Sequence, residues 1–333
     1  MAQWNETWKS EQWRADAAQW IDLVLMTYEL TKTGEPQQTF NGIFSTQISV
    51  PTDHGKLFFK ANNPGQYAEV SVTAVAANLA PDQLIMPLAI EPQRGWMITP
   101  DYGETLRVLP TTDYQLWARM LRDFAKVQRS LVDFGETLFD AGLLHLDPAW
   151  LPHYIDDQLV LHASMPRGHA LHLPARDAED LDGQLGEVKG MCEFLAAGPV
   201  PLSLEHNDLH RGNAFVPTTP DEPLRFMDLG DSYWAHPFGS LGTPIRVMCE
   251  ELKTTPNDPR IRSAVTSYLE QWTDFGTVEE LWEYVEPALR AGKLQQHAMA
   301  MRILADASEQ DLEEHAGLAL RPLAELAQPI FTD

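Results

Sequence analysis

The sequence is poor in the residues and segments that would tie it to a structural metal, an oxidising compartment or a membrane. It has two cysteines, Cys192 and Cys249, which lie far apart and show no paired metal-binding spacing, so we expect reduced, buried thiols. No apolar run approaches the roughly 18–20 residues of a membrane span, and the N-terminus lacks the regions of a signal peptide. We therefore expect a cytoplasmic protein with no membrane partner.

Basic residues are also scarce. The chain has 24 lysines and arginines against 48 aspartates and glutamates, which gives a formal net charge of −24. Nucleic-acid binding needs a basic surface to neutralise phosphates, and no basic stripe is present, so we expect no nucleic-acid partner. The acidic excess has two interpretations. In the first, acidic residues around a cleft raise the local concentration of an amine substrate. In the second, which we favour, the excess only gives the protein an acidic surface.

What is present is enough apolar material for a large core. The chain has 333 residues, 44 % of them hydrophobic, and no internal repeat, which allows two lobes or one large domain. Helical spacing of apolar residues predicts a helix over residues 4–30. A β-rich stretch with turn signals such as Asn41-Gly42 follows. Its expected elements are strands at 39–50, 56–61, 84–90 and 96–99, with one helix at 66–79.

Beyond residue 103 the pattern becomes helical. The expected helices are 113–131, 148–161, 178–195, 241–253, 260–272, 278–291 and 311–326. Only the polar segment between residues 204 and 232 resembles strand in this part. A small, mostly antiparallel sheet followed by a large helical part predicts an α+β chain of two lobes with a cleft between them.

The polar segment carries the most specific chemistry. Asp208 is followed five residues later by Asn213, and Asp228 comes fifteen residues after that. Phosphoryl transfer from a metal nucleotide uses such a set, in which one Asp accepts the proton of an incoming hydroxyl. An Asn and a second Asp hold Mg²⁺ against the phosphates.

Two alternatives remain open. The first is a metal-dependent hydrolase: His206, Asp208 and His210 alternate, so they would share one face of a strand, and imidazole and carboxylate groups ligate transition metals. Asn213, however, is a poor ligand for such metals. The second alternative is a protein that binds nucleotide without turnover, a pseudokinase, against which the complete set of two aspartates and one asparagine argues.

The segments HNDLHRGN (residues 206–213) and FMDLGD (residues 226–231) resemble the motif pair of the aminoglycoside phosphotransferase and choline-kinase-like family, whose fold is that of protein kinases. The resemblance is strong over residues 204–241 and looser over the N-terminal part. The family more often has Gly where this chain has Asn207 and Pro where it has Arg211. Neither change touches a chemical role.

The resemblance implies a protein-kinase-like fold, with a nucleotide-binding lobe over residues 1–103 and a helical lobe with the acceptor site over residues 104–333. It implies a small-molecule kinase that transfers the γ-phosphoryl of ATP or GTP to a hydroxyl, with Mg²⁺ as cofactor. The acceptor would be amine-bearing or polyhydroxylated, such as an aminoglycoside-type antibiotic, an amino sugar or a choline-like metabolite. Trp234, Trp272 and Trp282 are candidate aromatic contacts for it. The oligomeric state stays open.

By position, the resemblance makes Asp208 the catalytic base and Asn213 and Asp228 the Mg²⁺ ligands. His206 is expected to hold the loop by hydrogen bonds, and Arg211 to contact phosphate or solvent. Four residues are thus candidates for supporting or substrate-contacting roles: His206, His210, Arg211 and Asp231.

In the N-terminal lobe the family fold implies a strand lysine that meets the α- and β-phosphates and a helix glutamate that holds it. Lys60 fits the first role, and Glu69 is the nearest partner. Residues 39–45 would form a hairpin over the phosphates, with the hydroxyl of Ser45 available to them. Main-chain atoms of the segment between the lobes would pair with the purine, and the residues assigned to it are Ile98, Thr99 and Asp101.

Overall fold

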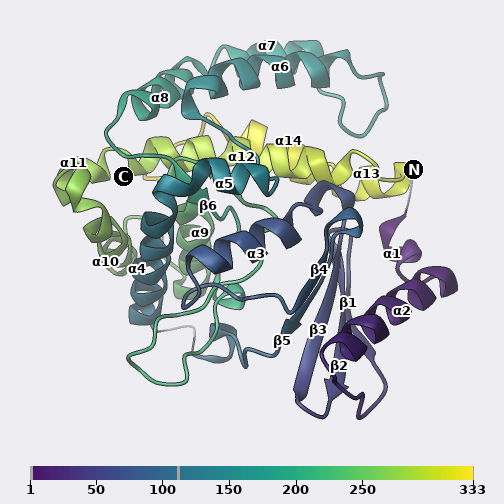
Figure 1. Ribbon diagram of the computed structural model, residues 1–333. Coiled ribbons are helices and arrows are strands. Elements are labelled where there is room, and N and C mark those ends of the chain that lie inside the picture. Colours follow the sequence, from purple (N-terminus) through teal and green to yellow (C-terminus); the bar gives the residue numbers. More distant parts are fainter. Residues whose placement is uncertain (1–2, 111–112, 333) are drawn as a thin grey trace.

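The computed structural model describes residues 3–110 and 113–332. Residues 1, 2, 111, 112 and 333, which the expected lobes include, lie outside the described residues. The chain forms a five-stranded antiparallel sheet, followed by a mostly helical part that also holds a two-stranded sheet (Figure 1). This arrangement confirms the predicted α+β fold class.

The five-stranded sheet has the order β1-β2-β3-β5-β4. Alternation along β3 points Lys60 to one face and Phe59 to the other, and the two pair with Met97 and Ile98 of β5. The face that carries Lys60 therefore points toward the helical part, and the face that carries Phe59 packs under α2. The strands are β1 (Gln37–Asn41), β2 (Ser45–Thr52), β3 (Gly55–Asn62), β4 (Ala89–Glu91) and β5 (Trp96–Pro100).

Helix α2 (Glu11–Thr27) covers the apolar face of the sheet (Figure 1). Trp20 packs edge-on against Phe59 and Trp96, with ring centroids 5.8 and 5.9 Å apart. The single helix predicted over residues 4–30 is in fact two, because Ser10 interrupts it and its hydroxyl accepts the N–H of Trp13 as an N-cap. The short first helix is α1 (Trp4–Thr7).

Two predicted strands differ from those observed. The strand expected over residues 39–50 is a hairpin, β1 and β2, whose turn begins at the Asn41-Gly42 signal. The strand expected over residues 84–90 is reduced to β4. Leu84 instead forms a parallel bridge with Phe226 of the helical part. The Phe226 N–H donates to the Gln83 carbonyl at 2.8 Å, and the Ile85 N–H donates to the Phe226 carbonyl at 3.1 Å. Helix α3 (Glu69–Leu79) lies where it was expected.

The helical part contains more helices, separated by more breaks, than the apolar periodicity of the sequence predicted. The segments expected at 178–195, 278–291 and 311–326 are each two helices, because short turns interrupt them without breaking the apolar spacing, and α5 was not predicted. The helices are α4 (Tyr114–Leu131), α5 (Gly135–Asp140), α6 (Leu151–Ser164), α7 (Ala175–Asp182), α8 (Gly186–Ala197), α9 (Gly242–Leu252), α10 (Pro259–Leu269), α11 (Val278–Trp282), α12 (Val285–Leu304), α13 (Glu309–His315) and α14 (Gly317–Ala324). The short sheet pairs β6 (Ser203–Glu205) with β7 (Tyr233–Ala235).

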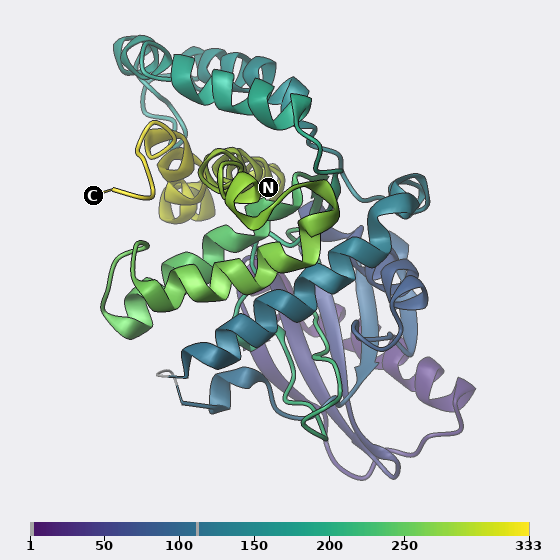
Figure 2. The same cartoon turned by 90° about the vertical axis from the view of Figure 1, so that its left-hand side faces the viewer.

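Helices α6, α7 and α8 form an outer layer beside α12 and α14 (Figures 1 and 2). Helix α12 is central: it packs on α8, on α14 and on the segment Pro237–Leu241 that follows β7. None of the helices in the described residues is long and apolar enough to cross a membrane.

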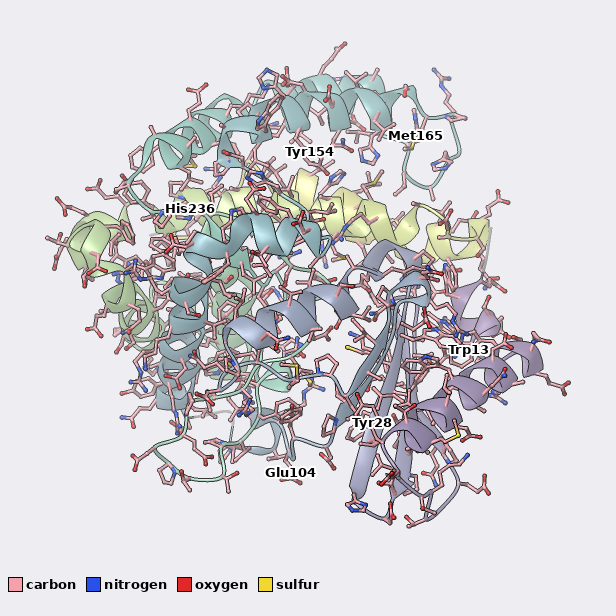
Figure 3. All side chains as sticks on the ribbon, in the orientation of Figure 1. Trp13, Tyr28, Glu104, Tyr154, Met165 and His236 are labelled. Atoms are coloured by element: carbon pink, nitrogen blue, oxygen red, sulfur yellow. The ribbon has the colours of Figure 1, made fainter. Side chains whose placement is uncertain are left out.

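A chain of three polar side chains, the partly buried Tyr154 and the buried His162 and His297, joins the outer layer to α12. Tyr154 points from α6 toward α12 (Figure 3), and its hydroxyl lies 2.7 Å from His297 Nδ1. His297 Nε2 lies 3.0 Å from His162 Nε2, and His162 Nδ1 lies 2.8 Å from the carbonyl of Leu171. A carbonyl only accepts, so His162 donates through Nδ1, and His297 then donates to His162 and accepts from Tyr154. Both imidazoles are neutral in this arrangement.

This histidine pair predicts a loss of stability in acid. Burial lowers the pKa of both imidazoles, that of His297 to about 3. Between pH 6.5 and 3 the unfolded chain therefore binds more protons than the folded chain, and the free energy of unfolding falls as the pH falls. At pH 5 the neutral state of His297 alone lowers the free energy of unfolding by about 2 kcal/mol relative to pH 7. Urea unfolding at pH 7 and pH 5 measures it.

His297→Gln should weaken this pH dependence, because the variant has no imidazole to protonate at that position. It should not abolish it, because burial also lowers the pKa of His162, His206 and His236. His153→Gln, which changes an exposed histidine of the same helical layer, is the matched control and should leave the dependence as in the wild type. An unchanged slope in His297→Gln would contradict the assignment.

Candidate active site

The polar motif lies on a loop, not on a strand. Strand β6 ends at Glu205, and residues 206–210 run irregularly into a short turn at Arg211–Asn213. The premise that His206, Asp208 and His210 share one strand face is therefore wrong. In the described part of the chain, no three His, Cys, Asp or Glu side chains are grouped as a metal ion would require.

Asn207 sets the direction of the loop. Its φ is 64°, in the left-handed region, where glycine and asparagine are tolerated best. This explains why glycine suits the same position in the family that the motif resembles. The Asn207 N–H donates to Glu205 Oε1 at 2.8 Å, and the Thr243 hydroxyl donates to the Asn207 carbonyl at 3.1 Å. The next residue, Asp208, turns toward a cavity.

Asp208 is held between an asparagine and a histidine. Asn213 Nδ2 donates to the Asp208 carbonyl at 2.9 Å, which leaves Asn213 Oδ1 as the free end of the amide. His210 Nδ1 accepts the N–H of Gly212 at 2.9 Å, so its proton is on Nε2, which lies 3.4 Å from Asp208 Oδ2. The Asp208 side chain remains 40 % exposed. It is thus oriented and still open to a substrate.

Asp228 lies at the junction of the sheet and the helical part. Lys60 Nζ contacts Asp228 Oδ1 at 2.7 Å and both carboxylate oxygens of Glu69 at 2.8 Å. Burial alone would lower the pKa of Lys60, but the two carboxylates outweigh it and raise that pKa. Burial likewise opposes ionisation of Asp228, and Lys60 outweighs it and lowers the pKa of that carboxyl. The short spacing between Lys60 and Glu69 in sequence is therefore sufficient to pair them.

Two observations fit Asn213 and Asp228 to a Mg²⁺ ion. The Met227 N–H donates to the Asn213 carbonyl at 3.0 Å, which brings the two segments side by side. Asp228 has φ 68°, a strained backbone that is kept at functional positions. An amide oxygen and a carboxylate are hard ligands that suit Mg²⁺.

His206 occupies an architectural position, as the sequence predicted. It is fully buried, and its Nε2 donates to the Met227 carbonyl at 3.0 Å. Its ring packs edge-on against Phe124, and burial lowers its pKa. Because Nε2 carries the proton for this bond, it does not offer a lone pair to a metal.

Arg211 corrects an expectation. It contacts neither solvent nor the phosphate region, because its side chain is only 6 % exposed and pairs with Glu251 at 2.7 Å. Its guanidinium also donates to the carbonyl of Leu109 at 2.9 Å and lies 5.9 Å from the Trp117 ring. Its role is to hold the loop against α4 and α9. Nothing in the local sequence separates this role from a phosphate contact.

Arg211→Ala should therefore destabilise the fold and leave nucleotide affinity unchanged. Removal of one partner of a buried pair costs about 3–5 kcal/mol. The lower end is expected here, because the Glu251 side chain is 18 % exposed and keeps its hydrogen bond from Trp117. Urea unfolding and nucleotide titration together measure the two effects. Arg246→Ala, which removes an exposed arginine paired with Glu250, is the control. Weaker nucleotide binding at unchanged stability would restore the phosphate role.

A cavity of about 190 Å³ opens beside Lys60 and Asp228. Three of the residues that the sequence assigned to the nucleotide, Lys60, Glu69 and Thr99, line this cavity. Asp228, which was assigned to Mg²⁺, lines it as well. Its apolar and aromatic walls could not be recognised from sequence, because such residues are equally common in cores. The residues that it missed include Gln47, Phe58, Tyr102, Gly103 and Phe215.

The other three residues that the sequence assigned to the nucleotide do not line this cavity. Ile98 lies on the opposite face of β5, under α2, and its carbonyl accepts the N–H of Leu88 at 2.7 Å. Asp101 is exposed, and its carboxylate accepts the N–H of Gly103 at 2.9 Å. Ser45 is buried at the start of β2, on the same strand face as Gln47. The residues after β5 that line this cavity are Tyr102 and Gly103.

A larger cavity of about 680 Å³ lies on the other side of Asp208. Asn207, Asp208 and Asp231 line one end of it, and its walls come from α9, α12 and α14. Gln66 Nε2 donates to Asp231. Burial, with the nearby charges of Asp228 and Asp208, raises the pKa of Asp231 to about 7.

The tryptophans expected to contact an acceptor do not line this cavity. Trp272 is fully buried among aromatic residues of α10 and its surroundings. Trp234 packs against Phe139 with a centroid distance of 5.8 Å. Trp282 packs against Phe331 in a separate hollow. No aromatic side chain of the described residues lines the large cavity.

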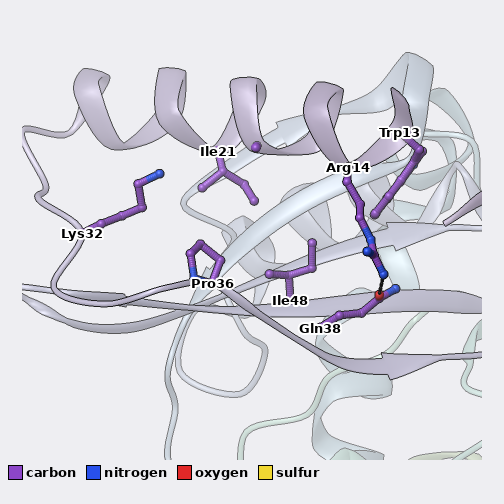
Figure 4. Close-up of a pocket in the computed structure, with 8 residues that line it drawn as sticks. Trp13, Arg14, Ile21, Lys32, Pro36, Gln38 and Ile48 are labelled. Atoms are coloured by element: carbon purple, nitrogen blue, oxygen red, sulfur yellow. Dashed lines mark hydrogen bonds between the residues drawn. The ribbon is translucent and has the colours of Figure 1, made fainter. Parts of the chain in front are cut away.

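A further hollow of about 410 Å³ lies between α2 and the outer face of the sheet (Figure 4). Trp13, Ile21 and Ile48 form its apolar walls, and Arg14 donates to Gln38 across it at 3.3 Å. It is on the face of the sheet opposite Lys60, so it is separate from the site described above.

Neither a family model nor a curated protein matches the sequence. Solved structures do match the fold. An ethanolamine kinase of Plasmodium vivax has a TM-score of 0.61 at 14 % identity, over 87 % of this chain and 81 % of that one. A choline/ethanolamine kinase family protein from Mesorhizobium loti has a TM-score of 0.55 at 18 % identity, over 89 % of each chain. A macrolide 2′-phosphotransferase from Brachybacterium faecium has a TM-score of 0.55 at 14 % identity, over 92 % and 98 %.

The chain therefore has the kinase-like fold that choline and ethanolamine kinases share with macrolide phosphotransferases. These matches cover most of both chains, so the sheet and the helical part are both included.

Proposed function

We propose that this protein is a small-molecule kinase that transfers the γ-phosphoryl group of ATP or GTP to a hydroxyl of a small acceptor. The observation that carries the proposal is the cluster of Lys60, Glu69 and Asp228. It joins the sheet to the helical part at 2.7–2.8 Å, next to Asp208 and Asn213. Residues 1–103 would form the nucleotide-binding lobe, and residues 104–333 would carry the catalytic loop and the acceptor site.

Each residue has a role that follows from its position. Asp208 accepts the proton of the acceptor hydroxyl, and His210 Nε2 keeps its carboxylate turned toward the cavity. Lys60 meets the phosphates and gives up part of its contact with Asp228 to do so. Asn213 and Asp228 would hold Mg²⁺, which when bound neutralises charge on the phosphates. Catalysis thus rests on positioning and charge, with no covalent intermediate on the protein.

The nucleotide base fits the cavity between the sheet and the helical part. Phe215 and Tyr102 line it with ring centroids 5.6 Å apart, and Phe58 lines it from β3. The hydroxyl of Tyr102 is bonded to the main chain of Met86, which fixes the segment after β5. We place the reaction in the cytoplasm, since nucleotide triphosphates are available there and both cysteines are free thiols.

The large cavity favours an acceptor that is read by hydrogen bonds and ion pairs. Asp231 and Asn207 lie beside the reacting end, and cations from three helices line the walls: Arg246, Lys293 and Arg321. Because no aromatic side chain of the described residues lines the cavity, an aromatic cage for a quaternary ammonium is not provided. We therefore favour a polyhydroxylated acceptor over choline.

A screen for acceptor-dependent release of ADP or GDP tests the proposal. The library contains amino sugars, aminoglycosides, macrolides, neutral polyols, choline and ethanolamine, each with Mg²⁺ and either nucleotide. Mass spectrometry of the hits must show one added phosphoryl group. Nucleotide binding without any phosphorylated product, and without slow phosphoryl transfer to water, would instead support a pseudokinase.

A further inference from the structure

Glu205, the last residue of β6, is a fully buried carboxyl group next to the catalytic loop. Its Oε1 accepts the N–H of Asn207 at 2.8 Å, and its Oε2 has no hydrogen-bond partner. No lysine or arginine of the described residues forms an ion pair with it. An ionised carboxylate here would be costly, because burial removes its water without supplying a counter-charge.

A second acceptor without a partner lies beside it. Gln295 on α12 is 1 % exposed, and its Oε1 also has no hydrogen-bond partner. Both side chains meet at Gly239: a Cβ built there would lie 3.1 Å from Gln295 Oε1 and 3.4 Å from Glu205 Cδ. Glycine at residue 239 thus leaves room for both side chains. Neither oxygen has a donor, and a proton on the Glu205 carboxyl would supply one.

We propose that Glu205 is a neutral carboxylic acid that ties the catalytic loop to α12. One of its oxygens accepts from Asn207, and the other donates its proton to Gln295. This single proton satisfies both of the buried acceptors that otherwise have no partner.

The surroundings of Glu205 agree with a neutral acid. The titratable groups that face it are Asp231, Tyr233 and Tyr268, and none of them is a cation at neutral pH. Burial raises the pKa of Glu205 to about 8, against the opposing effect of hydrogen bonding from the Asn207 N–H and the Ser240 hydroxyl, and the charge of Asp231 acts in the same direction as burial. At pH 7 the protonated form therefore predominates.

The consequence for the site is positional. Glu205 fixes the N–H of Asn207, whose left-handed backbone aims Asp208. Helix α12, on the other side of the link, lines the large cavity through Lys293 and Gln296. Glu205 thus sets the base relative to the wall of the acceptor cavity without touching substrate. This consequence rests on the proposed function, whereas the protonation state does not.

Infrared difference spectroscopy of the wild type minus Glu205→Gln at pH 7 tests the protonation directly. The expected result is the C=O stretch of a carboxylic acid, shifted in deuterated solvent. Glu69 and Asp231 are present in both proteins, so their bands cancel. Glu193→Gln, which changes an exposed glutamate of α8, should give carboxylate bands. Carboxylate bands for Glu205 would overturn the proposal.

Hydrogen exchange of the Asn207 amide tests the link. Glutamine supplies both an acceptor for Asn207 and a donor for Gln295, so Glu205→Gln should retain protection, whereas Glu205→Ala should exchange roughly tenfold faster. Equal loss in both variants would contradict the neutral acid. If Glu205→Gln does not fold, the infrared experiment uses Gln295→Leu instead. Leucine cannot accept the proton of Glu205, so the C=O stretch of the carboxylic acid should shift in that variant.

Turnover separates the two proposals. Glu205→Ala should lower kcat for phosphoryl transfer, to an acceptor or to water, while the KM for nucleotide stays within about twofold, since the lost contact costs positioning and not nucleotide binding. An acid band and protected Asn207 in a protein without any phosphoryl transfer would retain the neutral acid and refute the proposed function.

Discussion

Asp208→Asn is expected to lower phosphoryl transfer by about 10²–10⁴-fold, because an amide cannot accept the proton of the incoming hydroxyl. The substitution keeps the size of the side chain and the main-chain carbonyl that Asn213 contacts. Nucleotide affinity should therefore change little. Single-turnover kinetics with a verified acceptor, or with water when no acceptor is known, measures the chemical step, and calorimetry measures the affinity.

The matched control is Asp221→Asn, which makes the same chemical change on an exposed turn between the two motif segments. It should leave both quantities as in the wild type. A near-wild-type rate in Asp208→Asn would remove Asp208 from the chemistry. The next group to examine would then be Asp231, the other carboxylate at the same end of the cavity.

Lys60→Ala is expected to raise the KM for nucleotide by roughly ten- to a hundredfold, the equivalent of the 1.5–3 kcal/mol that a charge-assisted hydrogen bond contributes. The KM for the acceptor should change much less, since the large cavity does not include Lys60. The substitution also leaves the fully buried carboxylate of Glu69 without its cation, whereas the side chain of Asp228 is 40 % exposed and is partly solvated. The free energy of unfolding should therefore fall by about 3 kcal/mol, the lower end of the cost of breaking a buried pair.

Lys56→Ala provides the control for this prediction. Lys56 lies on the same strand and, four residues away, on the same face, but its side chain is 51 % exposed. It should change neither KM nor stability. Equal changes in the KM for nucleotide and for acceptor in Lys60→Ala would indicate a general disturbance of the cleft, not a phosphate contact.

The candidate catalytic residues could be proposed from the sequence because the chemistry of phosphoryl transfer restricts residue types. Only Asp, Asn and a few others ligate Mg²⁺ or accept a proton, so Asp208, Asn213 and Asp228 stand out in sequence, and Lys60 follows from the fold. The structure then brings Lys60 and Asp228 together, 168 residues apart, at 2.7 Å. Their roles remain proposals that the variants above test.

The remainder was not predictable because burial is a tertiary property. The sequence does not show whether an arginine such as Arg211 is buried or binds phosphate at the surface. Only the fold, which places Glu251 beside Arg211, shows that it is buried. Trp234 and Trp272 were candidates for ligand contacts but lie in the core, because aromatic residues serve both purposes. Ile98 was assigned to the nucleotide but lies on the face of β5 under α2, and its carbonyl is already bonded to Leu88, which only the packing and pairing of the sheet decide.

Titration of ATP and GTP into the wild type and Asp228→Ala, with and without Mg²⁺, tests the central claim most directly. We expect the wild type to bind nucleotide in the presence of Mg²⁺ and to bind it much more weakly without the ion. In Asp228→Ala, the affinity for nucleotide should be the same with and without Mg²⁺. Nucleotide binding that is indifferent to Mg²⁺ and to Asp228, or tight zinc binding that His210→Ala removes, would contradict it.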